Sequence, residues 1–280
     1  MTPLPDLLLE PVVRAALVED LSPMGDATTR AVTPAGLTCT AALNAREAGV
    51  VSGMQVAAMA FRLVDPALQV QRRVADGASC AAGDTLMTIT GAAASVLMAE
   101  RVALNFAGRL SGIATQTAAF VAETRGTGAR ITCTRKTTPG LRMLEKAAVA
   151  HGGGSNHRYG LSDAILIKDN HIAAAGGIAP VLAAVRAARS HMMRVEIEVD
   201  RLDQLAEVLA LGGADVVLLD NMDTATLRQA VALVAGQMVT EASGNMRRDR
   251  IAEVAATGVD YISCGALTHS ARTLDLGLDF

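Results

Sequence analysis

The sequence predicts an α/β fold whose second half is a parallel sheet of repeated strand–helix units, and three observations support this prediction. From about residue 131 onward, short apolar runs alternate with amphipathic segments of helical length. Polar or glycine-rich segments follow the expected strands at their carboxyl ends. Before about residue 109, short strand-like segments are instead separated by Asp-Gly and Gly-Asp turns. We therefore expect two regions, the second containing either a barrel or a doubly wound sheet.

The second region alternates regularly between strands and helices. Its strands are expected at residues 131–133, 164–167, 194–199, 215–219, 238–241 and 259–263, and its helices at 141–150, 178–188, 202–211, 224–234 and 248–257. A Gly-rich dinucleotide fingerprint does not follow the first strand, which disfavours a dinucleotide-binding sheet.

The first region opens with a helix expected over residues 7–20, followed by strands at 38–44, 49–53 and 68–74. Residues 74–89 resemble the turn-rich strands of a lipoyl-like sandwich. They contain no lysine, so a carrier role with a lysine-attached prosthetic group is excluded. Residues 100–124 are predicted to form a helix that links the two regions.

Composition limits the classes of function. The 280 residues are 51% hydrophobic and 19% charged, which is typical of a globular protein with a sizeable core. The net charge of −3 predicts no general attraction to nucleic acid or to anionic membranes. We expect a cytoplasmic enzyme, because there is no signal peptide and no long apolar segment, and because the cysteines are scattered singly without metal-ligand spacing. These cysteines are Cys39, Cys80, Cys133 and Cys264.

The polar groups that follow the expected strands are candidates for chemistry, since β/α barrels carry their active sites at this rim. The segments are Arg135–Gly140, Lys168–His171, Glu198 with Asp200, Asp220-Asn221, Glu241–Asn245 and Gly265–Leu267. Loops are polar in general, but a series at one rim of the sheet favours a binding site.

The strand at residues 194–200 alternates acidic and aliphatic residues. Its acids, Glu196, Glu198 and Asp200, share one face. A solvated edge strand is the ordinary interpretation of such alternation. In repeated strand–helix units, however, helices cover the aliphatic face, and the acids then point into the barrel. Inward carboxylates would suit Mg²⁺ and sugar hydroxyls.

Two glycine turns follow the last strands, Ser243-Gly244-Asn245 and Gly265-Ala266. Glycine lets backbone N–H groups approach a phosphate closely, and barrels commonly bind phosphate at this position. One such turn is weak support for a phosphate site, and two in consecutive units are stronger support.

A group of cationic residues suggests anionic ligands. The lysines of the chain are Lys136, Lys146 and Lys168, all in one short stretch. Near them lie Arg135, Arg142, His157 and Arg158, the last two after a run of three glycines at 152–154. Each arginine alone is most simply a surface ion pair, and each histidine a structural hydrogen bond. The group as a whole favours carboxylate or phosphate binding.

These segments together resemble quinolinate phosphoribosyltransferases over nearly the whole chain. The resemblance rests on residues 19–21, 25–29, 46–50, 100–101, 104–106 and 109–115, and most specifically on residues 134–142, 152–158 and 166–171. Every motif position matches the family pattern. The resemblance implies an N-terminal α/β sandwich domain over residues 1–110, completed by 270–280. It also implies an incomplete six-stranded β/α barrel over 111–269, the fold of type II phosphoribosyltransferases.

The resemblance implies a role for each matching residue. Quinolinate carboxylates would be bound by Arg101, Arg135, His157, Arg158 and Lys168. Lys136 and Lys168 would face the diphosphate of phosphoribosyl pyrophosphate, and Glu198 and Asp220 the ribose hydroxyls and Mg²⁺. The 5-phosphate would lie against Ser243, Gly244, Asn245, Gly265 and Ala266. Lys136, Lys168, Glu198 and Asp220 are then the expected catalytic residues. The family also implies a homodimer in which Arg101 acts in the neighbouring subunit's site.

The activity implied is transfer of the phosphoribosyl group to quinolinate with loss of CO₂, in NAD biosynthesis. Two alternatives remain at this level. A Schiff-base aldolase or lyase could use Lys168 as its nucleophile. A non-catalytic anion-binding protein is the other, although such a protein gains nothing from carboxylates beside its ligand.

Overall fold

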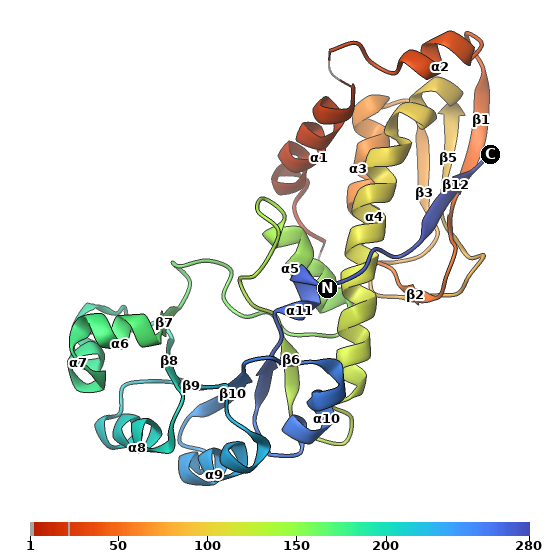
Figure 1. The fold of residues 1–280 in the computed structure, drawn as a ribbon. Coiled ribbons are helices and arrows are strands. Elements are labelled where there is room, and N and C mark those ends of the chain that lie inside the picture. Colours follow the sequence, from red (N-terminus) through yellow and green to blue (C-terminus); the bar gives the residue numbers. More distant parts are fainter. Residues whose placement is uncertain (1–2, 22) are drawn as a thin grey trace. The chain divides into compact units, whose positions relative to one another are not determined.

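The computed structural model describes residues 3–21 and 23–280, which form two compact units (Figure 1). The first unit contains the described residues up to Ala118, together with Thr138–Gly153 and Ser270–Phe280. The second contains Ala119–Thr137 and Gly154–His269.

The second unit is built on a parallel sheet of six strands in the order β6-β11-β10-β9-β8-β7. The bounds are β6 Arg130–Thr132, β7 Ile165–Ile167, β8 Val195–Val199, β9 Val216–Asp220, β10 Val239–Ser243 and β11 Tyr261–Ser263. β6 and β7 are the two terminal strands of this order, so the barrel is incomplete. The fold class predicted from the sequence is confirmed.

Helices follow the strands and lie outside the sheet (Figure 1). They are α6 Asp169–Ala175, α7 Ile178–Ala188, α8 Leu202–Leu211, α9 Thr224–Val234, α10 Arg248–Ala255 and α11 Ala266–His269. The core lies between the two layers. Val195 and Ile197 of β8 are fully buried, as are Leu205 and Val208 of α8. The aliphatic face of the alternating strand is therefore the covered one, as predicted, which leaves the acidic face toward the barrel interior.

The first unit contains an antiparallel sheet in the order β12-β1-β5-β3 and a small pair, β2-β4. The strands are β1 Thr38–Ala45, β2 Gly49–Val50, β3 Gln69–Arg72, β4 Ser79–Cys80, β5 Thr85–Ala92 and β12 Leu276–Asp279. The helices are α1 Asp6–Leu21, α2 Ala27–Val32, α3 Met54–Val64 and α5 Arg142–His151. Helix α4, Ala93–Ala122, begins in this unit, and its last residues belong to the second unit.

Several local predictions for the first region were wrong. The strand expected at 49–53 is only Gly49–Val50, because Gly53 takes the left-handed conformation with φ of 88° and caps α3. Helix α3 itself was not predicted. Helix α4 starts earlier than the expected residue 100, immediately after β5.

Among the described residues, no single helix has both the length and the apolar character to cross a bilayer. The bent pair α6 and α7, whose axes differ by 94°, passes that test only when the two helices are joined, and only by length and composition.

Candidate active site

A cavity of about 1090 Å³ lies at the carboxyl ends of the strands in the second unit. It brings together all the site residues predicted from the sequence except Arg101. These cavity-lining residues are Arg135, Lys136, His157, Arg158, Lys168, Glu198, Asp220, Ser243, Gly244, Asn245, Gly265 and Ala266. The parallel sheet explains the convergence, since each residue lies at or just beyond the end of a strand.

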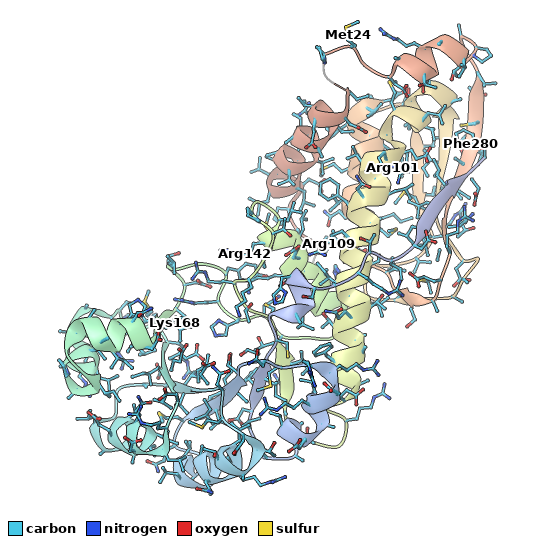
Figure 2. The ribbon with its side chains drawn as sticks, viewed as in Figure 1. Met24, Arg101, Arg109, Arg142, Lys168 and Phe280 are labelled. Carbon is cyan, nitrogen blue, oxygen red and sulfur yellow. The ribbon has the colours of Figure 1, made fainter. Side chains whose placement is uncertain are left out.

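Several of the cavity-lining residues are cationic. Lys168 follows β7, and its Nζ lies 2.6 Å from Oε2 of Glu198 on β8. The Lys168 side chain is 48% exposed (Figure 2), so its ammonium group is accessible to a ligand. Arg158 donates from one terminal nitrogen to the carbonyl of Ala164 at 2.9 Å, and its buried Nε has no hydrogen-bond partner in the part of the chain that the structure describes. Burial, and then the charge of Arg135, lower the pKa of Arg158.

Two arginines that the sequence analysis did not select, Arg247 and Arg250, also line the cavity. Their positions in the turn after β10 and on α10 place them at the same rim, and that position was the available signal. Arg142 differs, because it belongs to the first unit and is not among the residues lining the cavity. Lys146 also lies in the first unit, fully buried within α5.

The acidic strand was predicted to turn three carboxylates into the barrel, and for Asp200 this was wrong. Glu196 is buried, and the Glu198 side chain is 13% exposed and lines the cavity. Asp200 lies beyond the last residue of β8, is exposed, and pairs with Arg201 at 3.2 Å. Alternation between faces applies only within the strand, which ends at Val199.

The glycine turns after β10 and β11 fit closely against their neighbours. Gly244 has φ of 95°, and a Cβ there would collide with the Asn221 side chain. A Cβ on Gly265 would lie 3.0 Å from Cδ of Lys136. Gly244 is therefore required by its left-handed backbone and by Asn221, whereas at Gly265 a side chain would need Lys136 to move by a few tenths of an ångström. Whether a phosphate occupies these turns stays a prediction.

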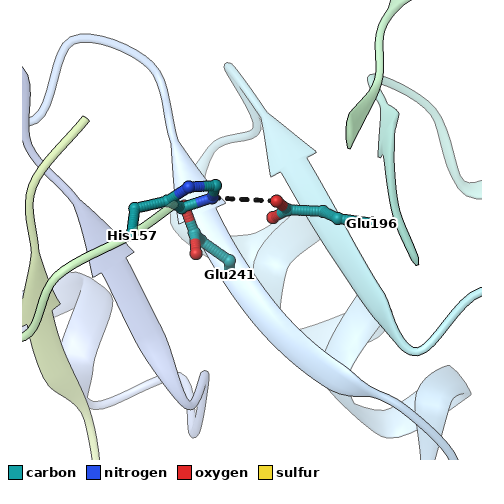
Figure 3. A group of neighbouring side chains, drawn as sticks. All are labelled: His157, Glu196 and Glu241. Carbon is teal, nitrogen blue, oxygen red and sulfur yellow. Dashed lines mark hydrogen bonds and ion pairs between the residues drawn. The ribbon is translucent and has the colours of Figure 1, made fainter. Parts of the chain in front are cut away.

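His157 and Glu241, which line the cavity, form with Glu196 a cluster that the sequence analysis missed (Figure 3). His157 Nε2 lies 2.8 Å from Oε2 of Glu196 and 3.7 Å from Oε1 of Glu241. His157 Nδ1 accepts the backbone N–H of Arg158 at 2.8 Å. With Nδ1 accepting a hydrogen bond, Nε2 is the ring nitrogen that donates to Glu196.

The two carboxylates of this cluster are buried, with exposed fractions of 6% for Glu196 and 4% for Glu241. One oxygen of each, Oε1, is buried and has no hydrogen-bond partner among the described residues. Burial, and then the charge of Glu196, raise the pKa of Glu241 to about 7. Glu241 is thus a carboxyl group that gains and loses its proton near neutral pH.

One ligand atom from each of these three residues lies within 4.8 Å of the others, a spacing that can also surround a metal ion. The direct contact of 2.8 Å between His157 and Glu196 is a hydrogen bond instead, and it closes the space that an ion would occupy. Glu198 and Asp220 are the better pair for a hard cation, because their carboxylates line the open part of the cavity.

The sequence matches two family models, the quinolinate phosphoribosyl transferase N-terminal domain over residues 26–111 and its C-terminal domain over residues 113–279. The chain belongs to the quinolinate phosphoribosyltransferase family. Nicotinate-nucleotide pyrophosphorylase [carboxylating] of Mycobacterium leprae is 46% identical over 95% of both chains. Its probable counterpart in Bacillus subtilis is 41% identical over 98% of this chain and 93% of its own.

Solved structures agree with this assignment. NadC from Streptococcus pyogenes superposes with a TM-score of 0.95 at 41% identity, covering 100% of this chain and 98% of its own. Human nicotinic acid phosphoribosyltransferase, at 15% identity and a TM-score of 0.63, shares the fold alone. In this quinolinate phosphoribosyltransferase family member, the cavity of the second unit is therefore the candidate active site.

Arg101 is the predicted site residue that the structure does not bring to this cavity. It lies on α4 in the first unit and is exposed (Figure 2). Its expected action in a neighbouring subunit remains a prediction.

Proposed function

We propose that this phosphoribosyltransferase transfers the phosphoribosyl group of phosphoribosyl pyrophosphate to quinolinate and releases CO₂. The products are nicotinate mononucleotide and diphosphate, and the reaction serves NAD biosynthesis. The observation that carries the proposal is that one cavity is lined by Arg135, Lys136, Arg158 and Lys168 and also by Glu198 and Asp220. Cations suit a pyridine with two carboxylates, and carboxylates suit the sugar of the donor. The names of the relatives support the same reaction.

Arg135, His157, Arg158 and Lys168 hold the quinolinate carboxylates in this proposal. Arg158 has a buried donor, Nε, that is not used within the protein. Such a group is costly unless a ligand accepts its hydrogen bond. The guanidinium group of Arg158 therefore favours a carboxylate bound next to it in the cavity.

Glu198 and Asp220 bind the ribose hydroxyls and hold Mg²⁺. Their carboxylate oxygens fit this ion, which prefers oxygen ligands and keeps part of its water shell in an open site. When bound, Mg²⁺ neutralises charge on the diphosphate. Lys136 and Lys168 stabilise the same departing group, and Ser243, Gly244, Asn245, Gly265 and Ala266 hold the 5-phosphate.

The protein residues mainly position and neutralise the reactants. As diphosphate leaves, positive charge grows on the anomeric carbon, and the nearby carboxylates of Glu198 and Asp220 stabilise it. The pyridine nitrogen attacks this carbon and becomes cationic. That cationic nitrogen withdraws electrons from the adjacent carbon, which allows its carboxylate to leave as CO₂.

We further propose a homodimer in which Arg101 of one subunit reaches the cavity of its partner. The exposed position of Arg101 on α4 supports this arrangement. A cytoplasmic location is proposed as well, supported by cysteines that form no disulfide among the described residues.

The decisive assay measures nicotinate mononucleotide formed from quinolinate and phosphoribosyl pyrophosphate in the presence of Mg²⁺. We expect one CO₂ and one diphosphate for each product molecule, and no product when nicotinate replaces quinolinate. Binding of both substrates without turnover would support the anion-binding alternative and contradict the proposal.

A Schiff-base enzyme using Lys168 is the second alternative. Its nucleophile must be a free amine, whereas Nζ of Lys168 is bound to Oε2 of Glu198 at 2.6 Å. Borohydride should therefore trap no adduct of Lys168 with a carbonyl substrate.

A further inference from the structure

Loss of CO₂ from the pyridine ring creates a chemical requirement for a proton. The carbon–carbon bond breaks, and its electron pair stays on the ring carbon next to the cationic nitrogen. One proton must then be added at that carbon to give nicotinate mononucleotide. The inference below rests on the proposed function, and it concerns which side chain donates this proton.

Glu241 has the position of a proton donor. It lies in β10, is 4% exposed, and lines the cavity that also contains Arg158 and Lys168. Its Oε1 has no hydrogen-bond partner within the described part of the chain. A buried carboxyl oxygen left without a partner at a cavity floor is costly for the fold, and it is explained if the group acts on what the cavity binds.

Burial and one neighbouring carboxylate favour the protonated form of Glu241. Burial is the main cause that raises its pKa, and the charge of Glu196 on β8 is the second. His157 and a side-chain hydrogen bond with Ser263, the last residue of β11, act in the opposite direction and lower this pKa by less. Cys264, the next residue, is a buried thiol whose pKa is raised to about 12 by burial and then by the charge of Glu241.

A buried carboxyl beside a second carboxylate holds its proton to higher pH than usual. Glu241 is only 4% exposed, and this burial is the larger cause of its raised pKa. The charge of Glu196 is the second cause. The resulting pKa of about 7 means that a large share of the enzyme carries this proton at neutral pH.

We propose that the Glu241 carboxylic acid donates the proton that replaces the departing carboxylate. The O–H bond of Glu241 breaks, its proton forms the new C–H bond with the electron pair left on the ring carbon, and Glu241 becomes a carboxylate. Water entering the open cavity returns a proton to Glu241 before the next turnover. Glu196 acts as a positioning residue whose charge helps to keep the acid protonated, and its hydrogen bond with His157 holds it beside Glu241.

The neighbouring cations of the cavity are less suited to this step. Nε2 of His157 lies 2.8 Å from Oε2 of Glu196, and Nζ of Lys168 lies 2.6 Å from Oε2 of Glu198. Arginine does not release protons in proteins. Among these groups, Glu241 has a pKa of about 7, which lets its proton be both held and exchanged near neutral pH.

The test compares the wild type with Glu241→Gln, which keeps the size of the side chain and removes its acidic proton. Glu207→Gln, an exposed change on α8, is the matched control. Diphosphate, CO₂ and nicotinate mononucleotide are measured separately in single-turnover experiments, together with the mononucleotide that retains both carboxylates. Circular dichroism checks that each variant is folded.

We expect Glu241→Gln to release diphosphate in the first turnover at nearly the wild-type rate. Formation of nicotinate mononucleotide should fall by about 100-fold or more, the usual contribution of a general acid, and the dicarboxylated mononucleotide should accumulate. The wild-type kcat should decrease as pH rises through about 7, and this decrease should be absent in Glu241→Gln. Glu241→Asp should restore part of the activity.

Wild-type rates of nicotinate mononucleotide formation in Glu241→Gln would overturn the inference. A rise only in the KM for quinolinate would overturn it too, because it would indicate a hydrogen bond to substrate rather than proton donation. Equal slowing of diphosphate release and product formation would indicate a structural role and have the same consequence. A wild type that releases no diphosphate from these substrates would instead refute the proposed function.

Discussion

Each unit of this molecule buries a carboxylate, and the two differ in how completely they are satisfied. Glu145, on α5 of the first unit, is fully buried. It accepts hydrogen bonds from Arg109 at 3.0 Å and from the backbone and hydroxyl of Thr138 at 3.0 and 2.8 Å. Glu241, in the second unit, is nearly as buried but leaves one oxygen without a partner.

The difference separates a structural carboxylate from a chemical one. Glu145 exchanges its water shell for charged and neutral donors, so its burial connects α4, α5 and the segment before α5. Glu241 has exchanged its water shell for the like charge of Glu196, the ring of His157 and one hydroxyl, that of Ser263, which leaves its burial only partly compensated. Unsatisfied groups of this kind concentrate at functional sites.

The largest effect should come from the lysines of the cavity. Replacing Lys136 or Lys168 by Ala should lower kcat/KM by about 100- to 1000-fold, since each removes a charge facing the reacting groups. The melting temperature should change little, because the Lys168 side chain is 48% exposed and is not packed in the core. Steady-state kinetics and thermal unfolding on the same preparation measure both quantities.

Near-normal turnover in both lysine variants would contradict their proposed roles. Mixing Lys168→Ala with Arg101→Ala subunits sharpens the test. If Arg101 acts in the partner's cavity, a mixed dimer holds one site with neither change, and activity should return on mixing. No recovery in demonstrated mixed dimers would contradict the shared site.

The next effect is on stability, at the satisfied carboxylate. Glu145→Ala should lower the free energy of unfolding by about 3 kcal/mol, because it leaves the guanidinium of Arg109 partly buried without its partner. Glu241→Gln at pH 6 should change it far less, since a neutral amide replaces a largely neutral acid. Denaturant titrations of both variants provide the comparison.

The double variant Glu145→Ala with Arg109→Ala serves as the control. It should lose less stability than the two single changes added together, because the partners interact directly. Full additivity, or a loss below about 1 kcal/mol for Glu145→Ala, would show that the pair does not connect these segments.

The two carboxylates also mark what sequence alone can predict. The periodicity of hydrophobic residues predicted the strands and helices of the second unit, and α7, α8 and α9 have the predicted bounds. The rim residues followed from the rule that parallel strands end together. The cluster of His157, Glu196 and Glu241 could not be found in this way, because its members come from separate segments and meet only through the curvature of the sheet.

Other errors have equally local causes. Helix α3 begins at a left-handed glycine, Gly53, and its start carries no side-chain cap that sequence could reveal. Asp200 continues the acidic alternation in the sequence but lies one residue beyond the strand. The periodicity of hydrophobic residues therefore predicted helices and strands. The pairing and the pKa values of the buried acids depend on the tertiary structure and could not be predicted in this way.

The smallest expected effect is a change in how stability depends on pH. The pKa of Glu241 is raised from 4.5 to about 7, so the folded chain keeps a proton that the unfolded chain releases. This contribution to stability is complete below pH 4.5 and is lost as pH rises through about 7. Glu241→Gln has no such proton, so between pH 5 and pH 8 its melting temperature should decline less than that of the wild type.

Thermal unfolding across this range, with Glu207→Gln as control, measures the difference. Parallel curves for all three proteins would mean that Glu241 does not hold its proton in the folded chain, and its contrast with Glu145 would then be one of hydrogen bonding alone.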